Sequence, residues 1–539
     1  MSALAEEQPL SGKSSLVTNV LEAAGATQPE ESLEDAWERM QKSSSAQRVD
    51  VSYEQSKVED SSVAEQDARL ARFGLGVELD ASVGRKLVAR RAFQEGSCVL
   101  KVEPFAAALL PRCRERRCAH CFCSIEAGHR KKCGGCGHVL YCGPACQKKD
   151  WKSHHRRECD GGPALSAALN NDETAVSDAI LACRAARRMR KNDLRSRPVG
   201  EKGAIEDVKL MLKFCTSEDD ARARAIARHC VGADWCAEPD VELVQKLIKA
   251  SGRNNFCRQD DVLDEVSALL SPVGALLNHS CYPTTCVAYD AQGRQCFMAC
   301  RNISEGDEIT HSYVDCGVPT EQRRERLRSI YGFDCACERC TAPWSARDAL
   351  LDGDEEGRSV SPQRLVRNER LRREAHEKEG DEEAALLDEA LAALGNCSET
   401  HVHRVQTQQA RAECALGSER YDDALELFRE VAELREKIYA PLPHARVALD
   451  YFTLYEIANW QGDARTARAA RERARWHLER TAAPDDRRLE DLHVAAAITS
   501  NQTADLAEGM IGFSVDDGGD WEAPPDDDDV WEPVERGSE

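Results

Sequence analysis

The 539-residue sequence lacks any run of about 18 apolar residues, the length that a membrane-spanning helix needs. Near its start, Glu6 and Glu7 stand where a secretory signal would carry basic residues ahead of an apolar stretch. Positive charge is also in short supply: 72 Lys and Arg against 95 Asp and Glu give a net charge of −23. These absences predict a protein of a reducing compartment, cytoplasmic or nuclear, without a membrane anchor. They also disfavour a general electrostatic binder of nucleic acid.

The charge is unevenly distributed along a chain that otherwise has the composition of a folded protein. With 42% hydrophobic residues, the length is enough for two or three domains that each bury a core. Basic residues dominate from Arg112 to Cys159, whereas acidic residues dominate from 516 to 535. We expect residues 501–539 to form an acidic disordered tail. This tail either folds back onto the basic segment or stays solvated and keeps the protein soluble.

Cysteine, by contrast, is abundant, with 25 residues, many of them at short spacings. A reducing compartment keeps most disulfides open, so such pairs indicate metal ligands. Between residues 118 and 159, eight soft ligands in four close pairs are enough for two tetrahedral Zn²⁺ ions in a cross-brace. The expected ligands are Cys118, Cys121, Cys133, Cys136, Cys142, Cys146, one histidine and Cys159.

The histidine ligand is either His154 or His155. We favour His155, because it lies four residues before Cys159 and would share one face of a helix with it. The alternative ligand, His154, would follow Cys146 after a gap of seven residues. Cys113 and Cys123 fall outside the pairs and are predicted to be bystanders.

The apolar pattern predicts an α+β protein whose β domain is interrupted twice. Residues 1–65 are polar and are expected to form a disordered arm, with one short helix near 33–40. Residues 83–89 and 98–102 have the pattern of a β-hairpin, and strand-like segments return at 273–277, 286–289, 296–300 and 308–313. The zinc module and a helical block at about 160–250 separate these two sets of strands.

A helical region is predicted at 366–500, after a linker at 343–365. Within it, Gly417, Tyr421, Ala424 and Phe428 have a looser counterpart 45 residues on, at Gly462 and Ala469. Small residues on one helix face allow close packing, which favours stacked helix pairs of the tetratricopeptide kind. A helical bundle without true repeats is the alternative.

Four motifs stand out along the chain. The paired cysteines of residues 118–159, together with Tyr141 and the run Gln147-Lys148-Lys149-Asp150-Trp151, look like a MYND zinc finger. Leu276-Leu277-Asn278-His279-Ser280-Cys281 and Gly306-Asp307-Glu308-Ile309-x3-Tyr313 resemble the SET signatures, and Tyr331-Gly332-Phe333-Asp334-Cys335-Ala336-Cys337-x2-Cys340 resembles the post-SET motif. In this order, the four motifs are similar to those of the SET and MYND domain family of protein-lysine methyltransferases. The expected divisions are 66–117 and 251–316 for the SET domain, 118–159 for the finger, 160–250 for the insertion, and 317–342 for the post-SET segment.

The resemblance implies transfer of a methyl group from S-adenosylmethionine to a lysine of a histone or non-histone protein. It makes Tyr313 the catalytic residue and also a cofactor neighbour. The other implied cofactor residues are Arg85, Lys86, Asn254, Asn278, His279 and Phe333, with Asn255 an equal candidate for the place of Asn254. A third zinc, held by Cys281, Cys335, Cys337 and Cys340, would clamp the C-terminal segment against the cofactor pocket, giving about three zinc ions per chain.

One departure leaves two functions open. The family usually has a second glycine where this chain has Lys86, and a side chain there either crowds the cofactor or points to solvent. The alternative to an enzyme is therefore an adaptor that binds partners through its finger and helical repeats. The finger implies binding of Pro-rich peptide segments in either case.

Overall fold

The structure is a computed structural model that describes residues 61–80, 83–159, 161–190, 199–213, 221–232, 240–341 and 348–492. The chain divides into two compact units, Met1–Glu59 and Asp60–Glu539, and every described residue belongs to the second. The helix expected near 33–40 and the acidic tail at 501–539 lie outside the described residues. The predicted arm extends too far, because helix α3 (Ser61–Ala71) occupies its last five residues.

The α+β class is confirmed, but the predicted hairpin is wrong in its pairing. Both segments are strands, β2 (Gly84–Ala89) and β3 (Cys98–Val102), yet they do not pair with each other. β2 pairs antiparallel with β1 (Leu75–Asp80), and β3 pairs with β11 (Gln295–Ala299), far along the chain. Alternation of apolar residues marks a strand, whereas its partner is set by tertiary packing.

The strands that follow the insertions join β3 and β4 in two three-stranded sheets, and two of them form one short parallel pair. The sheets have the orders β10-β11-β3 and β4-β8-β7, and β12 pairs with β9. The remaining strand bounds are β4 (Ala106–Leu109), β7 (Asn255–Gln259), β8 (Glu265–Leu270), β9 (Asn278–His279), β10 (Thr285–Tyr289) and β12 (Thr310–His311). The strand expected at 273–277 is instead a 3-10 turn, and the one at 308–313 shrinks to two residues.

The finger and the inserted helices lie between β4 and β7 in the sequence. The finger contains a small ladder of β5 (Lys131–Lys132) and β6 (Leu140–Tyr141), then α4 (Pro144–Asp150), a short π-helix at Trp151–His155 and α5 (Arg156–Glu158). The insertion is helical, as predicted. Its helices are α6 (Gly162–Ala168), α7 (Glu173–Arg190), α8 (Val199–Lys213), α9 (Ala221–Gly232) and α10 (Val241–Asn254).

Helix α11 (Thr320–Tyr331) follows the last SET strand, and the described part of the C-terminal region contains six longer helices after it. They are α13 (Pro362–His376), α14 (Gly380–Leu394), α15 (Val402–Gly417), α16 (Tyr421–Tyr439), α17 (Ala445–Gln461) and α18 (Ala464–Thr481). Each packs mainly against the next in sequence, as in stacked helix pairs rather than a closed bundle. Gly417 ends α15, and Gly462, with φ of 77°, ends α17.

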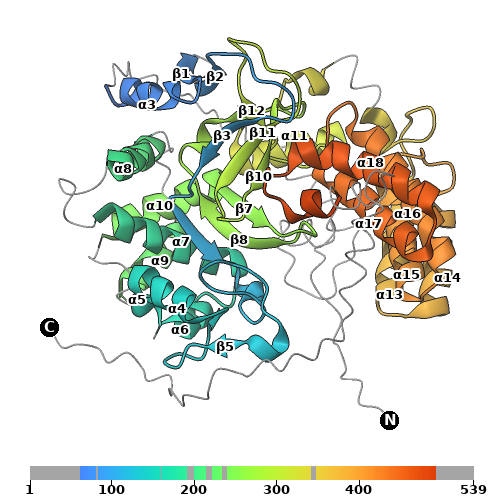
Figure 1. The fold of residues 1–539 in the computed structure, drawn as a ribbon, viewed down its shortest axis with the longest axis horizontal. Coiled ribbons are helices and arrows are strands. Elements are labelled where there is room, and N and C mark those ends of the chain that lie inside the picture. The colour runs from blue at the N-terminus through green and yellow to red at the C-terminus, as the bar shows by residue number, and fades with distance from the viewer. Residues whose placement is uncertain are drawn as a thin grey trace, which may run out of the picture. The chain divides into compact units, whose positions relative to one another are not determined.

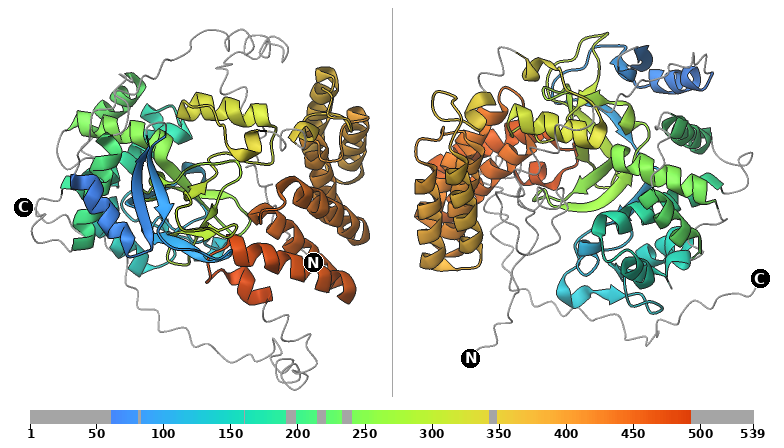
Figure 2. Two further views of the ribbon diagram at one scale, coloured as in Figure 1. Left: turned by 90° about the horizontal axis from the view of Figure 1, so that it is seen from above. Right: turned by 180° about the vertical axis from the view of Figure 1, so that it is seen from behind.

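These parts pack around the SET strands, which lie in the middle (Figures 1 and 2). The C-terminal helices cover one side and the finger with the inserted helices covers the other. Three large apolar cores result: one under β1, β2, β3 and β11, one between β4, β8 and the inserted helices, and one in the C-terminal helices. The third core includes Cys281, Cys335 and Cys340, so it reaches the predicted third metal site. No described helix combines the length and apolarity that a membrane crossing requires.

Candidate active site and metal sites

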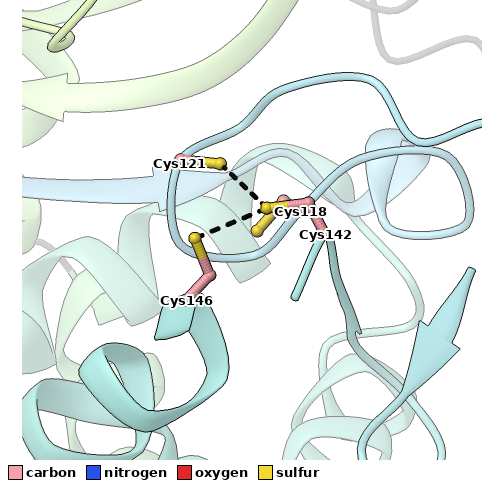
Figure 3. A group of neighbouring side chains, drawn as sticks. All are labelled: Cys118, Cys121, Cys142 and Cys146. Carbon is pink, nitrogen blue, oxygen red and sulfur yellow. Dashed lines mark hydrogen bonds between the residues drawn. The ribbon is translucent and has the colours of Figure 1, made fainter. Parts of the chain in front are cut away.

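The finger brings its first and third cysteine pairs together, as a cross-brace requires. Cys118 and Cys121 lie on the loop after β4, while Cys142 and Cys146 flank the start of α4 (Figure 3). Cys142 Sγ is 3.7 Å from Cys121 Sγ and 3.5 Å from Cys146 Sγ. Four thiolates around one zinc at Zn–S of ~2.3 Å stand ~3.8 Å apart, so this donor set fits Zn²⁺.

The second and fourth pairs form another group, and it contains His155 rather than His154. His155 Nε2 lies 3.3 Å from Cys133 Sγ and 3.5 Å from Cys136 Sγ, and Cys159 Sγ lies 3.8 Å from Cys133 Sγ. Cys159 N donates to His155 O at 2.7 Å, the one-turn spacing that places both side chains on the same side. Three thiols and one imidazole are a second donor set suited to zinc.

The two cysteines outside the pairs behave differently. Cys113 is buried in the core beside the inserted helices, where its thiol points to the Glu265 carbonyl at 3.7 Å. Cys123 is exposed, and its sulfur lies 3.4 Å from that of Cys121, at the edge of the first group. Of these two cysteines, Cys123 is thus the one close enough to exchange with a ligand.

The third group gathers Cys281 from the turn after β9 and three cysteines that follow α11. The four sulfurs of Cys281, Cys335, Cys337 and Cys340 lie within 4.8 Å of one another, with Cys281 and Cys340 at 3.6 Å. Cys281 N also donates to Cys337 Sγ at 3.4 Å. This arrangement joins the segment after α11 to the Asn278-His279 turn, as the sequence predicted.

A buried ionic network supports the third group from behind. The Arg323 guanidinium, fully buried on α11, donates to Asp348 Oδ2 at 2.5 Å and lies 3.9 Å from Cys340 Sγ. Arg339 donates to the other Asp348 oxygen at 3.1 Å and to the Ile438 carbonyl at 3.4 Å. Because Ile438 belongs to α16, the network ties the cysteine group to the C-terminal helices.

Asn278 sits on β9, the parallel partner of β12, with Thr310 opposite it. Its Nδ2 donates to the Arg85 carbonyl at 3.1 Å and to Glu308 Oε1 at 2.8 Å. Both amide hydrogens are therefore used, and Oδ1 is the atom left to accept from a ligand. The same contacts hold the backbone of β2 beside the Asn278-His279 turn.

His279 and Tyr313, which lie far apart in the sequence, are in direct contact. Tyr313 N donates to His279 Nδ1 at 3.0 Å, and the two rings stand 5.3 Å apart. Burial lowers the pKa of His279 to about 4, which keeps Nδ1 an acceptor at neutral pH. Tyr313 Oη donates to the Leu277 carbonyl at 2.7 Å, and burial raises the pKa of this phenol.

Other aromatic side chains enclose Tyr313. The rings of Tyr331 and His311 each lie 4.8 Å from it, and the ring of Phe333 lies 6.5 Å away in an edge-on arrangement. Phe333 also faces His279 at 6.0 Å. The half-buried Tyr313 therefore forms part of a compact aromatic wall.

The contacts of the remaining predicted cofactor residues do not by themselves identify which of them would face a cofactor. Arg85 contributes its carbonyl to Asn278, while Lys86 Nζ turns toward Glu78 Oε2 on β1, at 3.5 Å. Asn254 ends α10 and donates to the Ala250 carbonyl at 2.9 Å. Asn255 is exposed at the start of β7, so the geometry does not choose between the two asparagines.

Three residues at this site were not predicted from the sequence. Glu308 accepts from Asn278, and His311 and Tyr331 pack on Tyr313. All three stand inside motifs that the sequence made visible, the segment 306–313 and Tyr331-Gly332-Phe333. The missing information was which of the motif side chains turn inward, and spacing alone does not supply it.

Sequence comparisons agree with this arrangement. Residues 84–314 match the SET domain family. The chain is 31% identical to the N-lysine methyltransferase SMYD2 of Mus musculus over 273 residues, which are 50% of this chain and 61% of that protein. It is 27% identical to the N-lysine methyltransferase SMYD2-A of Danio rerio over 376 residues, 67% of this chain and 84% of that protein. The chain thus spans about three fifths of the mouse relative.

Solved structures add little. One described as the SET domain of LSMT bound to lysine and AdoHcy aligns with 84% of this chain and 99% of its own, at 13% identity and a TM-score of 0.29. A likeness of that size supports no conclusion about this chain. The match over residues 84–314 and the two relatives lead to one conclusion: this chain is similar to the SET domain family and to N-lysine methyltransferases of the SMYD2 kind, and its interleaved cysteine groups agree with that similarity.

Proposed function

We propose that this protein is a protein-lysine N-methyltransferase that uses S-adenosylmethionine as methyl donor. One observation carries the proposal: the β9–β12 pair brings the Asn278-His279 turn and Tyr313 together, under the four-cysteine group. The N-lysine methyltransferase relatives described above support the same reaction class.

The residues around Asn278 fit the methyl donor. The amide oxygen of Asn278 is an acceptor suited to the ammonium of the donor's amino-acid part, with Asn254 or Asn255 as a second polar contact. Lys86 is drawn to Glu78 on the neighbouring strand, which favours a side chain that leaves the donor uncrowded. His279 and Phe333 present ring faces on which the adenine would pack. When bound, the donor supplies an electrophilic methyl group on a sulfonium.

Tyr313 is assigned the catalytic role. The substrate lysine must lose a proton, which costs about 4 to 5 kcal/mol from a pKa near 10.4 at pH 7. The aromatic wall around Tyr313 reduces this cost, because a dry environment disfavours the ammonium. Through its phenol, Tyr313 orients the neutral amine for in-line attack, and the Leu277 carbonyl fixes the phenol.

We propose that the three cysteine-rich groups hold three structural zinc ions. Their donor chemistry and sulfur separations support this, and Arg323 would offset part of the negative charge of the third site. The proposed ligands are Cys118, Cys121, Cys142 and Cys146, then Cys133, Cys136, His155 and Cys159, then Cys281, Cys335, Cys337 and Cys340.

The partners follow from the reaction and from the finger. The substrate is a protein that presents a lysine, and Pro-rich peptides are the proposed ligands of the finger. The thiol-rich metal groups support a cytoplasmic or nuclear location, because their cysteines bind zinc in the reduced form that such compartments maintain.

The test is transfer of labelled methyl from S-adenosylmethionine into proteins of a mixed lysate, followed by hydrolysis and detection of methyl-lysine. We expect methyl-lysine with the natural chain and none with Asn278→Ala. An inactive natural chain that still binds lysate proteins through its finger would establish the adaptor instead.

A further inference from the structure

A cavity of about 650 Å³ lies away from the proposed active site, where the finger meets α7 and the SET strands. Its walls come from residues 103–107, from finger residues 119–122 and 150–154, from three arginines of α7, from Arg258 on β7 and Leu269 on β8, and from the β10–β11 turn at 291–294. No cofactor or zinc residue proposed above lines it except Cys121. Cavities of this volume are typical of ligand sites.

The cavity wall is both apolar and basic. Phe105, Phe122 and Leu269 supply its apolar part. The basic part consists of Arg184, Arg187, Arg188, Arg258 and Arg294, with Lys101 next to Arg294 across Asp290.

Within the described part of the wall, carboxylates offset only part of this positive charge. Glu158 forms salt bridges with both Arg184 and Arg187, and Asp290 forms salt bridges with both Lys101 and Arg294. Glu103 and Asp150 also line the wall, and Asp485 lies beside Arg294, so six basic side chains meet five acidic ones. Nδ1 of His154, another wall residue, is buried without a hydrogen-bond partner among the described residues. A ligand rich in carboxylates would balance this wall.

The described chain ends close to this cavity. Asp485 Oδ2 accepts from the backbone of Ala291, a wall residue, at 3.1 Å. Arg488 Nη1 donates to the Asp261 carbonyl at 2.8 Å, and the neighbouring Asp260 pairs with Arg117, which directly precedes the finger. The last described residue, Leu492, follows four positions later.

The sequence that follows Leu492 is rich in acidic residues, which complement the basic side chains of the cavity wall. Among residues 516–535, ten are acidic, none is basic, and Trp521 and Trp531 flank the run Asp526–Asp529. Asp516 is 24 residues beyond Leu492, and an extended chain of that length spans up to about 80 Å. The segment can therefore reach the cavity, with carboxylates for the arginines and indoles for the apolar wall.

We propose that residues 516–535 bind in this cavity of the same chain. The contact bridges the finger and the SET domain on a face separate from the catalytic site. It is independent of the proposed methyl transfer.

Hydrogen exchange of the full chain, compared with a chain ending at Gly509, tests the proposal. Residues 103–107, 119–122 and 291–294 should exchange more slowly in the full chain at low salt, and the difference should disappear in about 0.5 M NaCl, where charges are screened. A peptide of residues 515–536 should bind the shortened chain, and its affinity should fall about tenfold over the same salt increase.

Variants at Arg258 sharpen the test, because this wall residue makes a long hydrogen bond, 3.5 Å, to the Cys121 carbonyl. Arg258→Gln should lower the affinity for the peptide severalfold, and Arg258→Lys should preserve that affinity. Arg367→Gln on α13 is the matched control and should leave the affinity unchanged. Identical exchange in the long and short chains would overturn the proposal. So would a peptide that binds the shortened chain while exchange in the full chain is unaffected, since this would indicate an acidic partner in trans.

Discussion

Asn278 has both of its amide hydrogens committed, and one of the two acceptors is the carboxylate of Glu308. This contact fixes which amide atom faces a ligand. In the proposed reaction, Glu308 is therefore a positioning residue for the methyl donor. It touches Asn278 from the segment that leads into β12, the strand partner of β9, so the same interaction also joins the two signature segments.

Replacing Glu308 by alanine should weaken S-adenosylmethionine binding about tenfold, because a charged hydrogen bond to the Asn278 amide is lost. Glu308→Gln keeps an acceptor and should restore most of the affinity. Calorimetry of the two variants checks this, with the exposed Glu305→Ala as control. Equal affinity in Glu308→Ala and the natural chain would remove the positioning role.

Tyr313→Phe keeps the aromatic wall but removes the hydroxyl that donates to Leu277. We expect methyl transfer to fall by about two orders of magnitude, with the affinity for S-adenosylmethionine nearly unchanged. Single-turnover transfer and calorimetry separate the two effects. Transfer at the full rate would show that the phenol has no part in the reaction.

Most of the metal ligands were predictable from the sequence, because cysteines rarely fall in such regular close pairs unless they share a metal. The preference for His155 over His154 followed from helix geometry, and the structure brings His155 among the thiols. Asn254 and Asn255 show what the sequence alone could not decide. Neighbouring residues of one type differ only in the direction of their side chains, which depends on how α10 ends.

Among the elements, α11 and the cysteine segment after it are held by one buried carboxylate. Asp348 is 2% exposed and lies between the guanidiniums of Arg323 and Arg339. Its contacts connect the third cysteine group to α16. No sequence pattern indicated this network, because Asp348 stands in a stretch that has the composition of a linker.

Asp348→Ala should destabilise the protein by about 3 to 5 kcal/mol, since it leaves two buried guanidiniums without their shared partner. Chemical denaturation gives the free energy of unfolding. The matched control is Glu389→Ala, which breaks a surface pair with Arg367 and should cost less than about 1 kcal/mol. Similar losses in both variants would mean that the buried network does not hold the segment.

Strand positions were predictable from alternation, but strand partners were not. β2 pairs with β1, a strand that the apolar pattern did not reveal, and β3 crosses to β11 beyond both insertions. The helical repeats were easier to predict, since their contacts are with the next helix in sequence. Non-local pairing is the information that a single sequence carries least directly.

For the molecule as a whole, stability should depend on pH through buried histidines. Burial lowers the pKa of His401 to about 4 and that of His477 to about 3, against about 6.5 in an unfolded chain. At a pH between the lowered pKa of the folded chain and the pKa of about 6.5 in the unfolded chain, these histidines are protonated only when the chain is unfolded. Stability is therefore fully present above about pH 6.5 and declines as the pH falls toward 4.

Thermal melts between about pH 7.5 and 5 check this dependence. The midpoint should fall with pH, and His477→Gln should flatten the fall, because one proton-linked group is removed. The exposed His376→Gln is the control and should leave the slope unchanged. A midpoint that rises on acidification would contradict the assignment.

Calorimetric titration of S-adenosylmethionine into zinc-replete protein, alongside Cys337→Ser, tests most directly whether the four-cysteine group clamps the Asn278-His279 turn and Tyr313 into one pocket. We expect the natural chain to hold about three zinc ions and to bind one donor molecule. Cys337→Ser should hold one zinc fewer and show no detectable binding of the donor. A metal-replete natural chain that does not bind the donor, or a variant that binds it undiminished without the third zinc, would contradict this clamp.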